Sequence, residues 1–190
     1  MRITKSDVIQ TAADIADKNG LSNVSLKAVA ESLNIRTPSL YNHIDSLEAL
    51  LREIAHNGMK TMNERMMQAA IGKIGDDAIK SVGITYLNYM IEHPGIYETI
   101  QWATWHGTEE TGKIFDNYLS LLKTLALSCN FNPVNIDEIL NLLTGVLHGC
   151  TTLQLRYAFT KPAEGRTDLS SALDTVLAGL HQKYDQHEKE

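Results

Sequence analysis

Cysteine and long apolar runs are both scarce in this sequence. Its two cysteines, Cys129 and Cys150, are too few for a disulfide framework and lack the spacing of a metal site. No apolar run approaches the ~20 residues that cross a bilayer, and the first residues enter a polar amphipathic pattern instead of an apolar signal segment. These absences argue against disulfide-rich secreted proteins and membrane proteins, and we expect a cytoplasmic protein.

Strand signals are equally scarce, because apolar and polar residues rarely alternate and no Asn-Gly turn joins β-branched runs. Apolar residues recur at helical spacing instead, which predicts an all-α fold. In chain order, the expected helices cover Lys5–Lys18, Leu26–Leu33, a short segment from about Arg36 through Tyr41, a long segment capped by Asp45 or Ser46 and running towards Met67, Asp77–Glu92, Ile96–Trp105, Glu109–Ser128, Ile136–Phe159 and Asp168–Tyr184. His93-Pro94-Gly95 is expected to break the helical run, and 161–165 to form a polar loop.

The first three expected helices have the residue pattern of a helix-turn-helix. Ala30 is small where two helices would cross closely, and Asn34 tolerates the left-handed backbone of a tight turn. Ile35 and Leu40 would then anchor the third helix on the first two. The side chains left facing outward suit base edges and phosphates in the major groove, and they are Arg36, Thr37, Ser39 and Asn42. A solvated surface without a partner is the alternative for this face.

The net charge of −6 does not by itself favour a nucleic-acid partner, and its distribution matters more. Residues 1–56 carry six Lys or Arg against seven Asp or Glu, a balance of −1, so the remaining −5 lies in the rest of the chain. A local basic face can therefore exist in the first part. The overall acidity lowers the expected strength of non-specific DNA binding.

These segments resemble the TetR family of repressors. The similarity lies in Val24–Ile35, in Arg36–Ile44 with its Leu-Tyr-x-His signature, and in Leu47–Leu51 at the start of the next helix. The sequence departs from the family at Asn34, where glycine is common, and at Leu47, where the family commonly has a lysine that contacts a phosphate. The resemblance implies a DNA-binding regulator in which that phosphate contact is absent or is made by another cation.

The resemblance also implies DNA contacts outside the recognition helix. Tyr41 and His43 would lie on the DNA backbone, and Ser25 and Lys27 would add phosphate contacts at the start of the second helix. Packing at a helix edge is the alternative for Tyr41, and capping of a helix end is the alternative for His43. The cations available to replace the missing lysine are Arg36, Lys27 and Lys5. The predicted DNA-contacting residues are Ser25, Lys27, Arg36, Thr37, Ser39, Tyr41, Asn42 and His43.

The second half resembles the TetR C-terminal domain named after its Trp-His-Gly motif. Trp105-His106-Gly107 is that tripeptide, and Leu147-His148-Gly149 matches a second patch of this subtype. Large soft and aromatic residues in the same helices could line an apolar cavity, with a few polar groups orienting a ligand. An ordinary core with satisfied histidines is the alternative. The residues predicted to contact a ligand are Tyr86, Met90, Tyr97, Trp102, Trp105, His106, Phe115, Leu119, His148, Thr151, Thr152 and Leu155.

The last two helices are the expected dimer interface. Gly145 and Gly149 lie four residues apart on one face of the helix near 136–159, where small residues admit a neighbouring backbone, and the helix over 168–184 has its own apolar stripe. Together the two helices could form a four-helix bundle across a two-fold axis. A dimer also places two recognition helices in successive major grooves, about 34–36 Å apart.

The sequence therefore predicts a helix-turn-helix DNA-binding domain over 1–47 and a ligand-binding and dimerisation domain over 48–190. The expected function is a transcriptional repressor that binds an inverted-repeat operator as a homodimer and is released by a small molecule. No catalytic residue, cofactor, metal or membrane partner is predicted. Two other classes stay open: a helical adaptor, and an enzyme built on the helical bundle, although the chain has no glycine-rich phosphate loop or nucleophile elbow.

Overall fold

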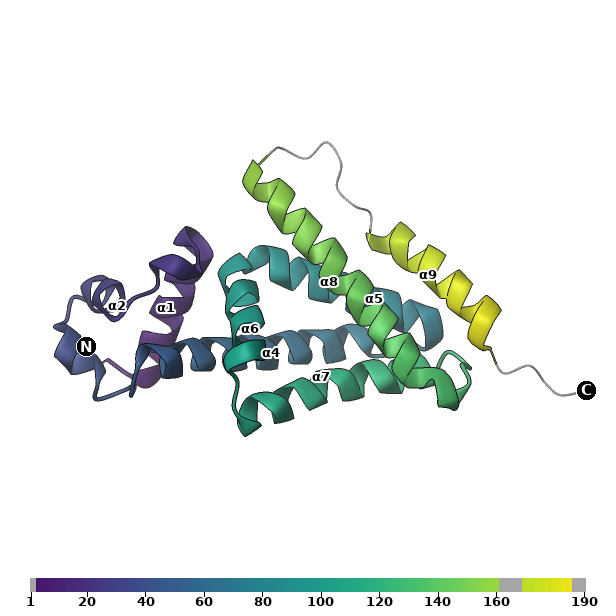
Figure 1. The fold of residues 1–190 in the computed structure, drawn as a ribbon, viewed down its shortest axis with the longest axis horizontal. Coiled ribbons are helices and arrows are strands. Elements are labelled where there is room, and N and C mark those ends of the chain that lie inside the picture. The colour runs from purple at the N-terminus through teal and green to yellow at the C-terminus, as the bar shows by residue number, and fades with distance from the viewer. Residues whose placement is uncertain (1–2, 161–168, 186–190) are drawn as a thin grey trace, which may run out of the picture. The chain divides into compact units, whose positions relative to one another are not determined.

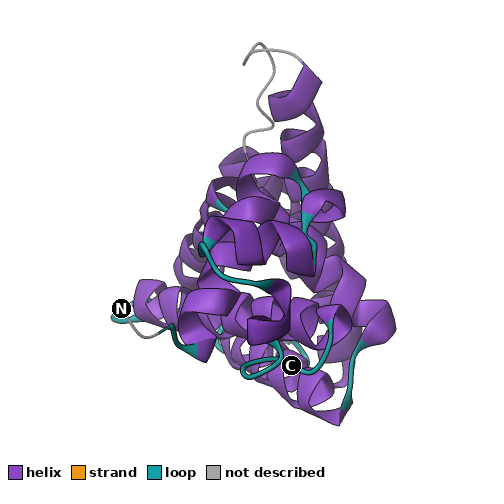
Figure 2. Cartoon of the chain, turned by 90° about the vertical axis from the view of Figure 1, so that its left-hand side faces the viewer, coloured by secondary structure: helices purple, strands orange, loops and turns teal. Residues whose placement is uncertain are grey.

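The computed structural model describes residues 3–160 and 169–185, and these residues form helices joined by short turns (Figures 1 and 2). The α-helices are α1 (Lys5–Asn19), α2 (Leu26–Ser32), α3 (Thr37–Leu40), α4 (Leu47–Ala70), α5 (Gly75–Glu92), α6 (Pro94–His106), α7 (Glu109–Leu127), α8 (Ile136–Thr160) and α9 (Leu169–Tyr184), with short 3₁₀ helices at Leu21–Asn23 and Pro133–Asn135. Within these described ranges no strand forms, apart from one isolated β-bridge between Phe131 and Asp185. The all-α prediction is confirmed, while the loop predicted over 161–165 lies outside the described residues.

The expected helices are present with small shifts at their ends. Ser46 rather than Asp45 caps α4, because the Ser46 hydroxyl accepts a hydrogen bond from the Ala49 N–H at 3.0 Å. Helix α6 starts at Pro94, two residues earlier than expected, since a proline in the first turn has no N–H that would be left unsatisfied. The break between α5 and α6 therefore consists of His93 alone. None of the helices in the described part of the chain is long and apolar enough to cross a membrane.

Contacts divide the chain into two compact units. Unit 1 comprises the residues up to Thr61 and Glu92–Phe115, and unit 2 comprises Met62–Ile91 and the residues from Asp116 onwards. Helices α4 and α7 each begin in unit 1 and continue along the chain into unit 2. The domain boundary predicted at residue 47 coincides with the first residue of α4 and lies inside unit 1.

In unit 1, Asp17 joins the end of α1 to the start of α6. One carboxylate oxygen of Asp17 accepts hydrogen bonds from the N–H groups of Gly95 at 2.8 Å and Ile96 at 3.1 Å, and the other oxygen lies 2.8 Å from Nδ1 of His93. These N–H groups belong to the first turn of α6, where no side chain of the preceding residue caps the helix. Gly95 lies directly on α1, since a Cβ there would be 2.1 Å from the carbonyl carbon of Ala16. Helix α6 is thus held against the backbone of α1.

Unit 2 is built from α5, α8 and α9 together with the later parts of α4 and α7. Gly83 of α5 allows close packing, because a Cβ at this position would lie 3.0 Å from the side chains of Leu147 in α8 and Leu173 in α9. Lys80 of α5 also bonds to Asp174 of α9 at 3.1 Å. The three helices are therefore joined by both apolar and charged contacts.

His181 makes the stability of the protein depend on pH. Its Nε2 lies 2.9 Å from Asp76 and its Nδ1 lies 2.7 Å from Asp185. Burial alone would lower the pKa of His181, but the hydrogen bonds to these two carboxylates outweigh it, so the pKa lies above its ordinary value of 6.5. A pKa that is raised on folding contributes stability that is fully present below the unfolded-state pKa and is lost as the pH rises through the folded-state pKa.

We therefore expect His181→Gln to lower the free energy of unfolding more at about pH 5.5 than at about pH 8.5. Urea denaturation of the natural protein and the variant at both pH values measures this difference. Comparing the two proteins at each pH removes the contribution of the other titrating groups. An equal loss at both pH values would contradict the role assigned to the two ion pairs.

Candidate functional site

The helix-turn-helix predicted near the N-terminus forms around α2 and α3. The Ser25 hydroxyl caps α2 by accepting a hydrogen bond from the Ala28 N–H at 3.1 Å. In the turn that follows, Asn34 has a φ of 54°, which is the left-handed conformation predicted for it. The Ile35 N–H then donates to the Ala30 carbonyl at 3.0 Å and closes the turn. Asn34, which occupies a position where the TetR family commonly has glycine, thus adopts the backbone conformation that the turn requires.

Helix α3 is short and is anchored by one buried residue. Arg36 precedes it with an extended backbone, and Pro38 lies in its first turn. Leu40 at its end is fully buried, and the Leu40 carbonyl accepts hydrogen bonds from the N–H groups of His43 at 2.8 Å and Ile44 at 3.0 Å. Because Leu40 faces the core, the opposite side of α3 faces outward.

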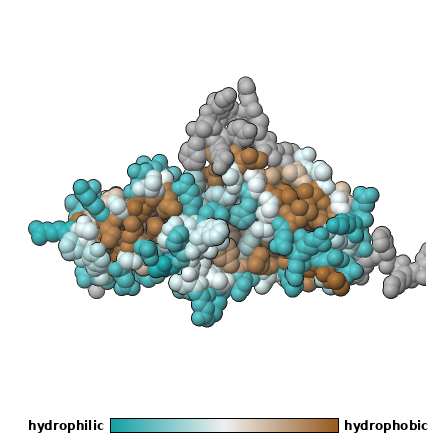
Figure 3. Space-filling view, in the orientation of Figure 1, coloured by the Kyte–Doolittle hydropathy of each residue, from teal (hydrophilic) through white to brown (hydrophobic). Residues whose placement is uncertain are grey.

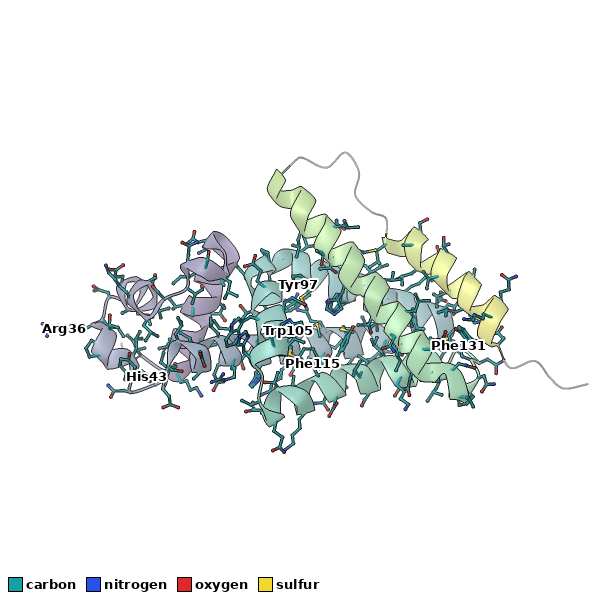
Figure 4. The ribbon with its side chains drawn as sticks, viewed as in Figure 1. Arg36, His43, Tyr97, Trp105, Phe115 and Phe131 are labelled. Atoms are coloured by element: carbon teal, nitrogen blue, oxygen red, sulfur yellow. The ribbon has the colours of Figure 1, made fainter. Side chains whose placement is uncertain are left out.

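All eight predicted DNA-contacting residues lie on this part of unit 1. Thr37 and His43 are half-buried, and the exposed ones are Ser25, Lys27, Arg36, Ser39, Tyr41 and Asn42. Tyr41 is 57% exposed, which favours a surface contact over a packing role. Arg36 projects away from the helices of this unit, whereas His43 lies closer to them (Figure 4).

The three cations considered for the missing lysine contact at the start of α4 differ in their ion pairs. Lys5 forms an ion pair with Glu53, and Lys27 lies 3.8 Å from Glu31 one helical turn further on. Arg36 makes no ion pair with any residue that the structure describes. Surface ion pairs are weak, so Lys5 and Lys27 could leave their glutamates for a phosphate. Arg36 would not have to break an ion pair to do so.

The residues predicted to contact a ligand are divided between the two units. Unit 1 contains Tyr97, Trp102, Trp105, His106 and Phe115, and unit 2 contains Tyr86, Met90, Leu119, His148, Thr151, Thr152 and Leu155. Trp105 is 86% exposed and Leu119 is 41% exposed. The buried members are Tyr86, Met90, Tyr97, Thr151 and Leu155. These five residues therefore lie in the interior, whereas Trp105 and Leu119 lie at the surface.

The Trp105-His106-Gly107 tripeptide ends α6 in unit 1. The His106 ring stacks on the Trp102 ring with centroids 4.7 Å apart and an angle of 7° between the planes, and its Nδ1 lies 2.9 Å from the Trp102 carbonyl oxygen. A Cβ at Gly107 would lie 2.6 Å from the Ala103 carbonyl oxygen. The tripeptide thus shapes the end of the helix, and the Trp-His-Gly subtype remains a prediction.

A group of polar side chains lies inside the apolar core of unit 2. The Tyr86 hydroxyl of α5 is hydrogen-bonded to Nδ1 of His148 in α8 at 3.2 Å, and the two rings meet edge to face with centroids 5.6 Å apart. The Tyr118 ring of α7 has its centroid 6.2 Å from that of Tyr86, and the Thr144 side chain of α8 lies beside the Tyr118 hydroxyl. Neither the Tyr118 nor the Thr144 hydroxyl completes a hydrogen bond with another described residue. We name Tyr86, Tyr118, Thr144 and His148 the polar cluster.

Burial disfavours a charge on Tyr118 and on His148 in the polar cluster. Burial raises the pKa of Tyr118 to about 12, despite the opposing effect of the Thr144 hydroxyl, and burial lowers the pKa of His148 below its ordinary value. No Asp, Glu, Lys or Arg side chain is fully buried in the part of unit 2 that the structure describes. Over the same part, no group of His, Cys, Asp and Glu side chains could hold a metal ion. The polar cluster thus offers hydrogen-bonding groups and apolar contact to a bound molecule, but no charged group.

Tyr118 was missed by the sequence analysis, although a signal for it exists. Ile114, Tyr118 and Leu122 recur at a spacing of one helical turn, and all three are buried in α7. The predicted contacts Phe115 and Leu119 lie one residue further along the same helix and are only partly buried or exposed. Following the helical spacing of α7 in full identifies the buried stripe that contains Tyr118.

The sequence is similar to that of a known regulator. No family model matches the chain. The helix-turn-helix transcriptional regulator YobS of Bacillus subtilis (strain 168), itself uncharacterized, is 31% identical over 179 residues. The match covers 94% of this chain and 93% of YobS.

Solved structures share the fold over nearly the whole chain. A TetR variant from Acinetobacter baumannii AYE, in complex with minocycline, has a TM-score of 0.74 at 18% identity, with 97% of this chain and 100% of that chain covered. BioQ with its natural double-stranded DNA operator has a TM-score of 0.70 at 16% identity, with 95% of this chain and 99% of that chain covered. At these identities, the likeness concerns the fold.

Proposed function

The chain belongs to the helix-turn-helix-type transcriptional regulators. Because it also has the fold of a TetR structure, we propose that it is a TetR-type repressor that binds an inverted-repeat operator as a homodimer and is released by a small molecule. The observation that carries this proposal is the outward face of α3, which the burial of Leu40 and the left-handed Asn34 orient. Residues 1–47 bind the DNA in this proposal, and residues 48–190 bind the ligand and the second copy. YobS is a helix-turn-helix-type transcriptional regulator, and we propose no catalytic activity for this chain.

The proposed DNA contacts fall into two groups. Residues at the start and on the outer face of α3 read base edges, because their side chains are short donors and acceptors together with one long cation: Arg36, Thr37, Ser39 and Asn42. Residues around this face contact phosphates and set the register: Ser25, Lys27, Tyr41 and His43. BioQ has been solved with its own double-stranded operator, and its fold is shared by this chain.

Selection of bound sequences from random duplex DNA tests the proposal. We expect an inverted repeat whose half-sites lie about 34–36 Å apart, because two recognition helices must enter successive major grooves. Arg36→Ala should weaken binding to the selected sequence by about 1–3 kcal/mol and relax the base preference at one position of each half-site. Affinity should also fall steeply as salt rises, because counterions are released.

Lys123→Ala is the matched control, since it removes an exposed cation from unit 2. It should leave both the selected sequence and the affinity unchanged. An affinity that does not respond to salt, or the enrichment of no DNA sequence, would favour the helical adaptor over the repressor.

Helices α8 and α9 support the proposed homodimer. Leu142, Gly145, Gly149 and Leu153 recur along one face of α8, and all of them are exposed. No atom of the described residues lies within 4 Å of a Cβ built at Gly145, Gly149 or, in α9, Gly179. Hydrophobic surface gathers over α8 and α9 (Figure 3). We propose that these helices form a four-helix bundle with their copies in the second chain.

The effector site in this proposal is the polar cluster of unit 2 together with Met90 and Thr151. The other predicted contacts remain predictions, and they are Tyr97, Trp102, Trp105, His106, Phe115, Leu119, Thr152 and Leu155. A ligand bound there would favour a dimer geometry whose recognition helices no longer match the groove spacing, and DNA would weaken ligand binding by the same factor. In this proposal α4 transmits the effect of the ligand, because this helix follows the helix-turn-helix in the chain and continues into unit 2.

A further inference from the structure

Two hydroxyl groups of the polar cluster are buried and have no hydrogen-bond partner among the described residues. Tyr118 is only 4% exposed, and its oxygen and that of Thr144 are shielded from solvent. A buried hydroxyl that forms no hydrogen bond destabilises the folded state, and folded proteins leave few buried polar groups without a partner. Both hydroxyls can donate and accept. A single hydroxyl or carbonyl oxygen placed between them would therefore give each of these two hydroxyls a hydrogen-bond partner.

The surroundings of these two hydroxyls are apolar and aromatic. The hydrogen bond between Tyr86 and His148 engages the polar atoms of that pair with each other and holds two rings next to Tyr118. Met90 follows Tyr86 by one turn of α5, Leu147 precedes His148 in α8, and both are buried. A molecule whose oxygen reaches Tyr118 would thus place its carbon atoms against ring faces and aliphatic side chains.

A charged molecule would have no counter-ion in this part of unit 2. No carboxylate, ammonium or guanidinium group is fully buried among its described residues. Moving an unpaired ion from water into such surroundings is strongly unfavourable. His148 could compensate a carboxylate only after taking up a proton, and burial lowers the pKa of His148. Both signs of charge are therefore disfavoured at neutral pH.

We infer that the effector is an uncharged molecule with an apolar, ring-containing body and one hydroxyl or carbonyl group that bonds to Tyr118 and Thr144. This inference rests on the proposed function, since it names the chemical class of the ligand that releases the regulator. It also assigns Tyr118 and Thr144, which the sequence did not indicate, as the residues that recognise the polar group.

Three probes of one shape and different charge test the inference, namely naphthalenemethanol, naphthoate and naphthylmethylammonium. Calorimetric titration of the full chain at neutral pH should show the alcohol binding at least about tenfold more tightly than either ion. Tyr118→Phe should weaken binding of the alcohol by roughly tenfold, because one hydrogen bond is lost. Methylnaphthalene, which has no polar group, should bind the natural protein and this variant equally.

Tyr118→Phe is expected to fold, because it removes a hydroxyl that forms no hydrogen bond with another residue in the described ranges, and thermal unfolding checks this. Tyr89→Phe is the matched control. It removes the hydroxyl of a buried tyrosine that lies in α5 outside the polar cluster, and it should leave the affinity for the alcohol unchanged. Equal or tighter binding of either ion would overturn the inference. The same conclusion would follow if the two tyrosine variants lost equal affinity, or if none of the probes bound.

The DNA selection described above separates this inference from the proposed function. A protein that selects an inverted repeat but fails the probe test would keep its assignment as a regulator and lose the inferred effector class. A protein that binds the alcohol through Tyr118 but selects no DNA would retain the inferred ligand class and lose the proposed function.

Discussion

Gly95→Ala is expected to lower the free energy of unfolding by about 3 kcal/mol or more, because the new side chain would overlap backbone atoms. A Cβ at this position would lie 2.1 Å from the carbonyl carbon and 2.4 Å from the carbonyl oxygen of Ala16, and 2.4 Å from the backbone nitrogen of Asp17. Backbone atoms cannot rotate away as a flexible side chain can. Helices α1 and α6 would have to separate, and the hydrogen bonds from Gly95 and Ile96 to Asp17 would be weakened. Urea denaturation followed by circular dichroism measures the loss.

Gly112→Ala is the matched control in the same unit. Gly112 lies within α7, and no described atom from outside the backbone of this helix lies within 4 Å of a Cβ built there. Alanine is favoured over glycine in a helix by roughly 0.5–1 kcal/mol, so this variant should be as stable as the natural protein or slightly more stable. Equal losses at the two positions would show that the close approach of α1 and α6 is not what requires Gly95.

Gly149→Arg is expected to convert the protein to a monomer and to reduce its affinity for the selected operator by roughly a hundredfold or more, because two linked half-site contacts become one. Among the described residues of the single chain there is room for an arginine side chain at this position, since no atom from outside the backbone of α8 lies within 4 Å of the Cβ. In the proposed four-helix bundle, the same side chain would meet the backbone of the second copy and bring a charge into an apolar interface. Analytical ultracentrifugation gives the mass in solution, and a titration with operator DNA gives the affinity.

Gly112→Arg introduces the same side chain at an open helical glycine of α7 and should leave both the mass and the DNA affinity unchanged. A folded Gly149→Arg variant that remains dimeric would place the interface elsewhere. A variant that is monomeric and still binds the operator with full affinity would contradict the need for two recognition helices.

Local sequence was sufficient for the helix-turn-helix. The cap at Ser25, the left-handed turn at Asn34 and the burial of Leu40 were all predicted, and each depends on residues only a few positions away. The beginnings and ends of the other helices were predicted almost as well, because Pro, Gly and Ser act at the position where they occur. Where the expected bounds shifted, as at Pro94, the same local rule explains the shift.

Contacts between distant parts of the chain followed no such rule. Asp17 bonds to Gly95, 78 residues further on, and neither residue type nor spacing indicates this pairing. Trp105 was expected in a ligand site because it is large and aromatic, yet it lies 86% exposed at the end of α6. Tyr118 was passed over in favour of Leu119, although it is Tyr118 that meets Tyr86 and Thr144 in the core.

The sequence by itself determined that the chain is helical, where most helices begin and end, and which side chains the helix-turn-helix presents. Hydrogen bonds within a helix and its caps span only a few residues, so they can be read in order along the chain. Only the tertiary structure decided that Gly95 lies on Ala16 and that the hydroxyl oxygens of Tyr118 and Thr144 are shielded without a hydrogen-bond partner in the described part of the chain. Helical periodicity identifies the apolar side of each helix, but the helix that covers this side is selected by the packing of all of them together.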